Sequence, residues 1–231
     1  MSGMYTTYQL TDRQLSEFLL RICHDLKTPV RAIRAHSELF LRGGEASDLA
    51  ERLSFVVDGA RKIDQIVESL TGFSIALQTD AESFQPAPMG VMLRSVLAKL
   101  KGELRDNGAE VTYGEMPRVL GSPDRLMQLL ENLLRNTLQH RGTASPRIDI
   151  TAKMVPAGWL FAVKDNGPGV DKDYLERIFR PLERGPSGHR SGAGMGLAIC
   201  RIIVERHGGK IWAESQAGGG VTIWFQLPAD D

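Results

Sequence analysis

The chain has 231 residues, of which 28 are basic and 28 acidic, so its formal net charge is zero. This length suffices for one or two domains with a buried core, and the 24 % charged and 42 % apolar residues are typical of folded chains. The charge balance excludes binding through a general excess of basic residues, and we expect no nucleic-acid partner. The only cysteines, Cys23 and Cys200, cannot form a disulfide framework, which favours a reducing, cytoplasmic location. No apolar run is long enough to span a membrane, and residues 1–10 lack the features of a signal peptide.

Residues 10–78 are predicted to form two long amphipathic helices joined by a turn at Arg42–Glu45. Both helices carry apolar residues at the helical period: Leu15, Phe18, Leu19, Ile22, Leu26, Val30, Ile33 and Phe40, then Leu53, Val56, Val57, Ala60, Ile63, Ile66, Val67 and Leu70. A single hairpin cannot bury two such stripes. We therefore expect residues 1–80 to pack against a second copy as a four-helix bundle, which makes the protein a homodimer.

After Pro86 and Pro88 the pattern changes to mixed helix and strand, which predicts a second domain over residues 84–231. Its expected fold is an α+β sandwich in which helices cover one sheet. The predicted elements are helices over Val91–Arg105, from Ser122 to about His140 and over Leu197–His207, strands over Arg147–Val155 and Trp159–Lys164, and a hairpin of Lys210–Ser215 and Val221–Leu227.

His24 lies on the face of the first helix opposite its apolar stripe, and Thr28 follows one turn later on the same outer face. Asp25 can hydrogen-bond one ring nitrogen, which would leave the other free to act as a nucleophile. Pro29 removes a backbone hydrogen bond and can bend the helix beyond the histidine. An ordinary surface histidine is the competing interpretation.

Two further segments contain polar groups at informative positions. Asn132 and Asn136 lie one turn apart on a predicted helix, where paired carboxamides could hold a hydrated magnesium ion, although two solvated asparagines would look the same. Asp165–Gly169 directly follows an apolar strand. Its acid can accept a hydrogen bond from the amine of a base and its glycines admit a flat ring, but the segment is also a strong turn signal.

Two glycine-containing segments follow. Ile178–Arg184, with the Gly/Ser/Pro-rich residues 185–192, is typical of a hydrophobic anchor beside a mobile lid, or of a plain surface loop. Gly192, Gly194 and Gly196 precede a predicted helix, and glycines at a helix start can present backbone N–H groups to phosphates. A glycine cluster by itself is weak evidence for such a site.

Taken in order, these segments resemble the catalytic core of a two-component sensor histidine kinase. His24–Pro29 is similar to the phospho-acceptor box and Asn132–Asn136 to the N box. Asp165–Gly169 and Gly192–Gly196 are similar to the two glycine boxes, and Ile178–Arg184 to the F box between them. The residues around His24 look closest to the phytochrome-like branch. The resemblance spans residues 10–228.

The resemblance implies a dimerisation and histidine-phosphotransfer hairpin followed by a Bergerat (GHKL) ATP-binding domain. It implies that His24 attacks the γ-phosphate of ATP with Asp25 as orienting base, and that the phosphoryl group passes to the receiver domain of a response regulator. Thr28 matches the position that places water for regulator dephosphorylation. Asn136 and Asn132 would bind Mg²⁺. The residues implied in nucleotide binding are Asn132, Arg135, Asn136, His140, Asp165, Gly167, Gly169, Phe179, Gly192, Gly194, Met195, Gly196 and Leu197.

The sequence departs from the family pattern at four positions. Gln139 and His140 stand where a lysine and an aromatic residue are common, and Leu182 and Glu183 replace a phenylalanine and a tyrosine. Losing the lysine predicts slow autophosphorylation, unless Arg135, Arg184 or Arg190 substitutes for it. A phosphotransfer scaffold with weak or lost ATP turnover is therefore the alternative. A non-kinase ATPase of the same fold is disfavoured because it needs no exposed histidine.

Overall fold

The computed structural model describes residues 11–42, 46–79, 84–183, 194–215 and 218–230. The chain divides into two compact units, one of residues 9–72 and one that includes all residues from Phe73 onward. By this division the boundary falls inside the second helix rather than in the 80–84 segment at which the sequence prediction places it. Within the described residues, no helix is long and apolar enough to cross a membrane.

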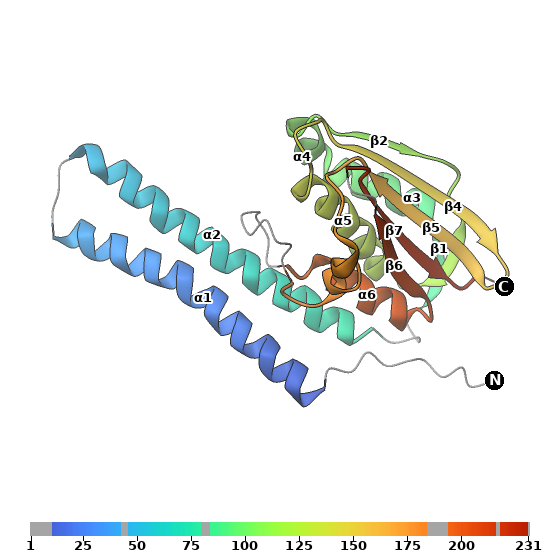
Figure 1. The fold of residues 1–231 in the computed structure, drawn as a ribbon, viewed down its shortest axis with the longest axis horizontal. Helices are drawn as coiled ribbons and strands as arrows, with labels where there is room; N and C mark the ends of the chain where they lie inside the picture. The colour runs from blue at the N-terminus through green and yellow to red at the C-terminus, as the bar shows by residue number, and fades with distance from the viewer. Residues whose placement is uncertain (1–10, 43–45, 80–83, 184–193, 216–217, 231) are drawn as a thin grey trace. The chain divides into compact units, whose positions relative to one another are not determined.

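The first unit is a hairpin of the two predicted helices, α1 (Asp12–Leu41) and α2 (Ala46–Leu77), drawn in blue to cyan in Figure 1. A capping box begins α1: the Thr11 hydroxyl accepts a hydrogen bond from the Gln14 amide, and the Gln14 side chain accepts one from the Thr11 amide. Pro29 lies inside α1 without ending it. Most of the predicted turn, residues 43–45, lies outside the described residues.

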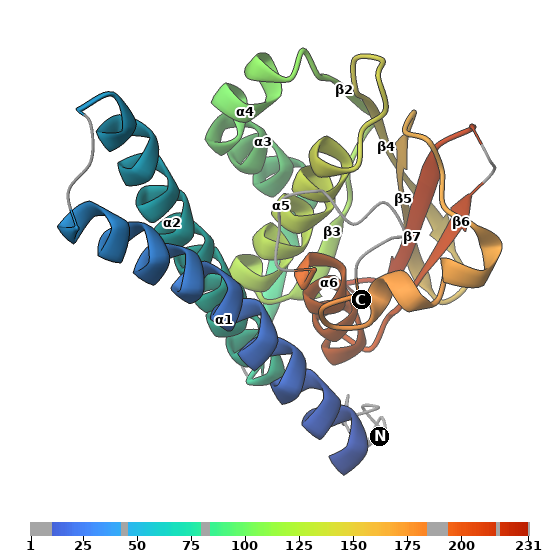
Figure 2. The same cartoon turned by 60° about the vertical axis from the view of Figure 1, so that its left-hand side comes forward.

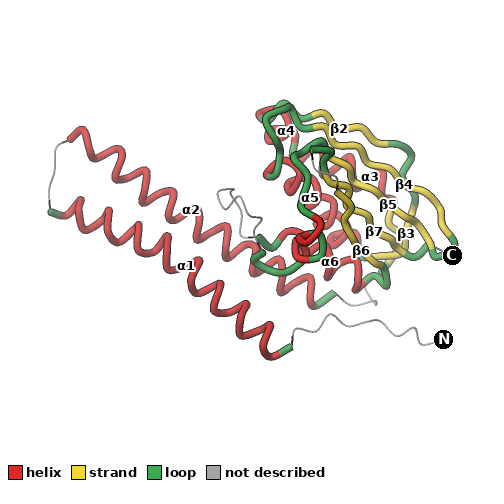
Figure 3. Tube along the Cα trace, in the orientation of Figure 1, coloured by secondary structure: helices red, strands yellow, loops and turns green. Residues whose placement is uncertain are grey.

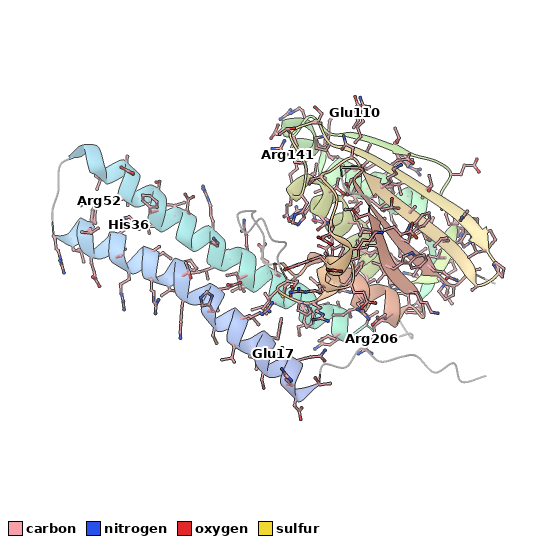
Figure 4. The ribbon with its side chains drawn as sticks, in the orientation of Figure 1. Glu17, His36, Arg52, Glu110, Arg141 and Arg206 are labelled. Carbon is pink, nitrogen blue, oxygen red and sulfur yellow. The ribbon has the colours of Figure 1, made fainter. Side chains whose placement is uncertain are left out.

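The two helices approach closely at Gly59 of α2. A Cβ atom at this position would lie 2.7 Å from Ile33 Cγ1 and 3.2 Å from the Pro29 carbonyl oxygen of α1. Nearer the turn, the ring of His36, which is labelled in Figure 4, stacks on Phe55 with ring centroids 4.3 Å apart. The two helices therefore contact each other both at Gly59 and nearer the turn.

The apolar stripe of α1 is only partly covered within one chain. Ile22 is buried, and Phe18, Leu26 and Ile33 are half-buried, as the helical period predicts. Exposed apolar side chains remain on both helices, among them Leu15, Leu19, Val30, Phe40, Leu53, Val57 and Val67.

The second unit contains a five-stranded sheet with strand order β2-β4-β5-β7-β6, in which only the β2–β4 pair is parallel. A separate antiparallel pair, β1 with β3, completes the strands, which are yellow in Figure 3. The strands are β1 (Gln85–Pro88), β2 (Glu110–Tyr113), β3 (Arg118–Gly121), β4 (Arg147–Val155), β5 (Gly158–Asp165), β6 (Lys210–Ser215) and β7 (Val221–Leu227).

Helices α3, α5 and α6 lie over one face of this sheet, which confirms the predicted α+β sandwich (Figure 2). Buried leucines of α5 and apolar residues of α6 fill the space between the layers, together with Phe161 and Phe225 from the sheet. The helices are α3 (Met89–Lys99), α4 (Lys101–Asp106), α5 (Pro123–Gln139) and α6 (Gly196–Arg206), with the short 3-10 helices η2 (Lys172–Tyr174) and η3 (Arg177–Phe179).

Two details of the sequence prediction were wrong. The single helix expected over Val91–Arg105 is two helices, because the backbone of Leu100 leaves the helical conformation and separates α3 from α4. The strands are not confined to one sheet, since β1 pairs only with β3. The prolines in β1 remove backbone donors, so this short strand lacked the usual sequence signal.

A buried histidine ties the end of α6 to the start of α5. The His207 ring donates from Nδ1 to the Ile203 carbonyl (2.7 Å) and accepts from the Ser122 amide at Nε2 (3.0 Å), while Phe84 stacks on it with centroids 4.4 Å apart. Burial lowers the pKa of His207 below its ordinary value, although its bond to the Ile203 carbonyl partly opposes this shift. The neutral ring is therefore favoured, and only a neutral ring can accept at Nε2.

Candidate functional site

His24 projects from α1 into solvent, as its position opposite the stripe predicts. Its side chain is 81 % exposed, whereas that of the neighbouring Asp25 is only 18 % exposed. The His24 Nδ1 atom lies 3.5 Å from Asp25 Oδ1, at the outer limit of hydrogen bonding. Asp25 thus faces Nδ1, and Nε2 is the ring nitrogen left for attack on an approaching group. Thr28, four residues later, is also exposed.

In the second unit, the end of β5 holds the half-buried carboxylate of Asp165. One of its oxygens, Oδ1, accepts hydrogen bonds from the backbone amides of Gly167 (2.8 Å) and Val221 (3.0 Å). Burial raises the pKa of Asp165, because desolvation outweighs these two bonds and the attraction of His140, all of which lower it. Two amides that bind the same oxygen fix the orientation of the carboxyl group.

Glycines allow the backbone to close around this acid. A Cβ atom on Gly220 would lie 1.9 Å from the Asp165 carbonyl oxygen, and the φ of Gly220 is +81°. A Cβ atom on Gly167 would lie 2.9 Å from Asp165 Oδ1 and 3.2 Å from the His140 carbonyl oxygen. Gly169 also has a positive φ, of 82°. Asp165, Gly167 and the end of α5 thus lie close together, and Gly220, which the sequence did not single out as a site residue, lies beside Asp165.

Helix α5 presents Asn132 to the first residue of α6. A Cβ atom on Gly196 would lie 4.0 Å from Asn132 Oδ1, so the N box and the second glycine box meet directly. The Asn132 Nδ2 atom is buried and makes no hydrogen bond within the described residues. Asn136, one turn later, is half-buried. Gly194 and Gly196 carry no side chains at this helix start, and the side chain of Met195 between them is buried.

Arg135 lies differently from the two asparagines. Its Nη2 atom pairs with Glu103 of α4 (2.9 Å) and with Glu131 one turn earlier (3.3 Å), and Glu131 also pairs with Lys99 of α3 (2.8 Å). Arg135 therefore links α5 to α3 and α4 in this structure, and its part in nucleotide binding stays a prediction. His140 is exposed at the end of α5.

The F-box segment anchors its hydrophobic residues beside the start of α6. Phe179, Leu182 and Met195 are buried, and Leu197 is 9 % exposed. The backbone amide of Leu182 donates to the Gly194 carbonyl (2.9 Å), which joins the two ends of the intervening segment. The predicted lid, Gly192 and the two substitutes Arg184 and Arg190 lie outside the described residues.

Sequence reasoning did not anticipate one ion pair in this segment. Arg177 Nη2 lies 2.5 Å from Glu183 Oε1, and the Glu183 side chain is only 9 % exposed. The six-residue separation spans the short helix η3 and the bend and turn that follow it, so no single helical or strand period predicts which side chains meet.

Family comparisons match both units. A family model described as the His Kinase A (phospho-acceptor) domain matches residues 14–76. A second, described as the histidine kinase-, DNA gyrase B-, and HSP90-like ATPase, matches residues 121–231. The chain belongs to the sensor histidine kinases.

Relatives of this histidine kinase core include phytochromes, as the residues around His24 predict. Cyanobacterial phytochrome A of Nostoc is 33 % identical over 222 residues, which cover 94 % of this chain and 29 % of that protein. Phytochrome-like protein Cph1 of Synechocystis is 32 % identical over 222 residues, covering 94 % and 30 %. The chain thus spans less than a third of the length of these relatives.

Solved structures of histidine kinases share the fold of this kinase core. The catalytic domain of histidine kinase ThkA superposes with a TM-score of 0.55 at 30 % identity, covering 63 % of this chain and 97 % of that one. A second structure, of ThkA in complex with the response regulator protein TrrA, has a TM-score of 0.70 at 23 % identity and covers 93 % of this chain and 61 % of that one. Because the second structure covers 93 % of this chain, the shared fold includes both units.

Proposed function

We propose that this chain catalyses ATP-dependent phosphorylation of its own His24 and then passes the phosphoryl group to an aspartate of a response regulator. The observation that carries the proposal is the exposed His24 ring, whose Nδ1 atom faces the carboxylate of Asp25. An ATPase of the same fold that makes no phosphoprotein needs no such nucleophile. Membership of the sensor histidine kinases supports the same conclusion.

The chemistry follows from which ring nitrogen is free. The Nε2 lone pair of neutral His24 attacks the γ-phosphorus of ATP, so that an N–P bond forms while the bond to the bridging oxygen breaks and ADP leaves. The ring then carries positive charge and keeps its proton on Nδ1, where the Asp25 carboxylate stabilises it. In the second step an aspartate carboxylate of the regulator attacks the same phosphorus, the N–P bond breaks and neutral His24 is restored.

The second unit would bind ATP through the groups gathered around Asp165 and the start of α6. Asp165 would accept a hydrogen bond from the exocyclic amine of adenine, beside the glycines at 167 and 169. Backbone amides at Gly194–Gly196 would face the phosphates. Phe179, Met195 and Leu197 would form the apolar support of this site.

The asparagines of α5 fit a magnesium ion. Amide oxygens are ligands that Mg²⁺ accepts. The buried Asn132 Nδ2 atom has no hydrogen-bond partner within the described residues, and a phosphate oxygen would supply one. Asn136 and Asn132 would hold the ion, which when bound neutralises charge on the phosphates. The cluster therefore fits the cofactor that the family implies.

Incubation of the full chain with γ-labelled ATP and Mg²⁺ tests the proposal. We expect label on the protein that is lost in acid and retained in alkali, accumulating slowly because Gln139 replaces a phosphate-binding lysine. The scaffold alternative predicts no label and no heat of Mg·ATP binding by isothermal titration. That pair of results would overturn the kinase proposal in favour of the scaffold.

We further infer that the first unit pairs with a second copy as a four-helix bundle, because apolar side chains of α1 and α2 remain exposed within one chain. The match to the phospho-acceptor domain supports a dimer of this kind. Light scattering at micromolar concentration should give twice the 25.5 kDa mass of one chain. A monodisperse monomer would refute the bundle.

The expected partner is the receiver domain of a response regulator. Support comes from histidine kinase ThkA, which has the same fold and whose solved complex contains a response regulator protein. Thr28 lies four residues after His24 on the same exposed stretch of α1. We propose that it places water when the kinase core dephosphorylates that regulator.

A further inference from the structure

An ion pair joins Arg177 of η3 to Glu183. The guanidinium of Arg177 meets the Glu183 carboxylate at 2.5 Å, and it also lies over the Tyr174 ring at 4.2 Å from the centroid. The Glu183 side chain is 9 % exposed while that of Arg177 is 42 % exposed. Arg177 thus supplies a positive charge to a carboxylate that is well covered from solvent.

Leu182, the residue before Glu183, has a backbone conformation that leucine seldom adopts. Leu182 has a φ of 61°, in the left-handed region that side chains other than glycine seldom occupy. Its own side chain is buried and its amide donates to the Gly194 carbonyl. Such a conformation persists only where the surroundings determine it from several sides.

Leu182 and Glu183 in turn pack directly on Gly194. A Cβ atom on Gly194 would lie 3.0 Å from the Glu183 carbonyl oxygen and 3.2 Å from the Leu182 carbonyl carbon. Gly194 lies two residues before α6, whose first residue, Gly196, faces Asn132. An unbroken series of contacts therefore joins the Arg177–Glu183 pair to the helix start and to the N box.

We infer that Arg177 and Glu183 are positioning residues that set the backbone of Gly194–Gly196 for the phosphates of ATP. The inference rests on the proposed function, because it assigns these amides to nucleotide binding. Neither side chain needs to contact ATP. Without the pair, the Glu183 carboxylate would lose the cation that it contacts, and the backbone of Leu182 and Glu183 would shift relative to Gly194.

Four variants of the full chain test this: Arg177→Gln, Glu183→Gln, the double substitution, and the conservative Arg177→Lys. In each glutamine variant we expect the KM for ATP to rise about tenfold while kcat stays within about twofold of the wild-type value. The reason is that the start of α6 contributes to binding of ATP in the ground state. The double variant should be no worse than either single one, because both remove the same interaction. Arg177→Lys should raise the KM less than Arg177→Gln does, since it keeps the positive charge but loses the planar guanidinium over the Tyr174 ring.

A binding measurement keeps this test separate from that of the proposed function. The affinity for a non-hydrolysable ATP analogue should fall by the same factor as the KM rises, and it can be measured even if no label reaches His24. Arg201→Gln is the matched control, since it breaks another arginine–glutamate pair of the same unit (Arg201 Nε to Glu205 Oε1, 2.8 Å) and should leave KM and analogue affinity unchanged.

Three results would overturn the inference. These are an unchanged analogue affinity in Arg177→Gln, single effects that multiply in the double variant, or a loss confined to kcat. Thermal unfolding of each variant detects a general loss of folding. If Arg177→Gln is poorly folded, Arg177→Lys is the variant to compare with the wild type, because a pair that only stabilises the fold would not make the KM for ATP depend on the positive charge at position 177.

Discussion

Replacing His24 by glutamine should lower phosphorylation of the chain by at least about a thousandfold, because the amide has no nucleophilic nitrogen. The His24 side chain is 81 % exposed, so its loss leaves no cavity and breaks no buried contact. We expect the free energy of unfolding to change by less than about 0.5 kcal/mol. Affinity for Mg·ATP should remain at the wild-type value, since the residues proposed to bind ATP lie in the other unit.

The measurement is transfer of label from γ-labelled ATP to protein, with chemical denaturation and calorimetry on the same preparations. His36→Gln is the matched control: it removes a second histidine of α1, one that stacks on Phe55 rather than facing solvent. That variant should lose some stability and keep its label. Acid-labile label that persists in His24→Gln would show that another residue accepts the phosphoryl group.

Elements with a strong period could be predicted from sequence, and elements set by tertiary contacts could not. The long helices and the β4–β5 and β6–β7 pairs follow from amphipathic or alternating patterns. By contrast, β1 contains two prolines in four residues and is a strand only because β3 lies beside it. The break at Leu100 likewise leaves no signal, since leucine is a good helix former.

The candidate site shows the same division. Asp165 and Asn132 could be singled out because each belongs to a segment with a recognisable order of residues. The sequence could not reveal that Gly220 closes over Asp165, or that Arg135 pairs with Glu103, because these contacts join segments far apart in the chain. The Arg177–Glu183 pair is close in sequence, yet the irregular backbone between its members hides it.

Replacing Asp165 by asparagine should lower the affinity for ATP by at least about a hundredfold while leaving the fold intact. The amide oxygen of asparagine can take the place of Oδ1 and still accept from the Gly167 and Val221 amides, which lie 2.8 and 3.0 Å away in the wild type. Its NH₂ group then occupies the position of the second carboxylate oxygen. There it would meet the amine of adenine, donor against donor, where the wild type offers an acceptor.

The substitution Asp165→Asn should not lower the stability of the fold, although it lowers the affinity for ATP. Because the folded-state pKa of Asp165 is raised, the protonated form is favoured by folding, and its contribution to stability is lost as pH rises from about 3.8 through the raised value. Asparagine does not ionise, so the variant does not lose stability in this way as the pH rises. At neutral pH it should therefore unfold at a temperature equal to or above that of the wild type. Weak binding in Asp165→Asn therefore cannot be ascribed to unfolding.

The base preference gives the sharpest readout. The carbonyl at the corresponding position of guanine would be repelled by the Asp165 carboxylate but can accept from the amide of asparagine. Titrations with Mg·ATP and Mg·GTP should thus show a clear preference for ATP in the wild type and a narrowed or inverted preference in Asp165→Asn. If both nucleotides keep their wild-type affinities in the variant, the base is held elsewhere, and the two amides on Oδ1 serve only to join the end of β5 to the start of β7.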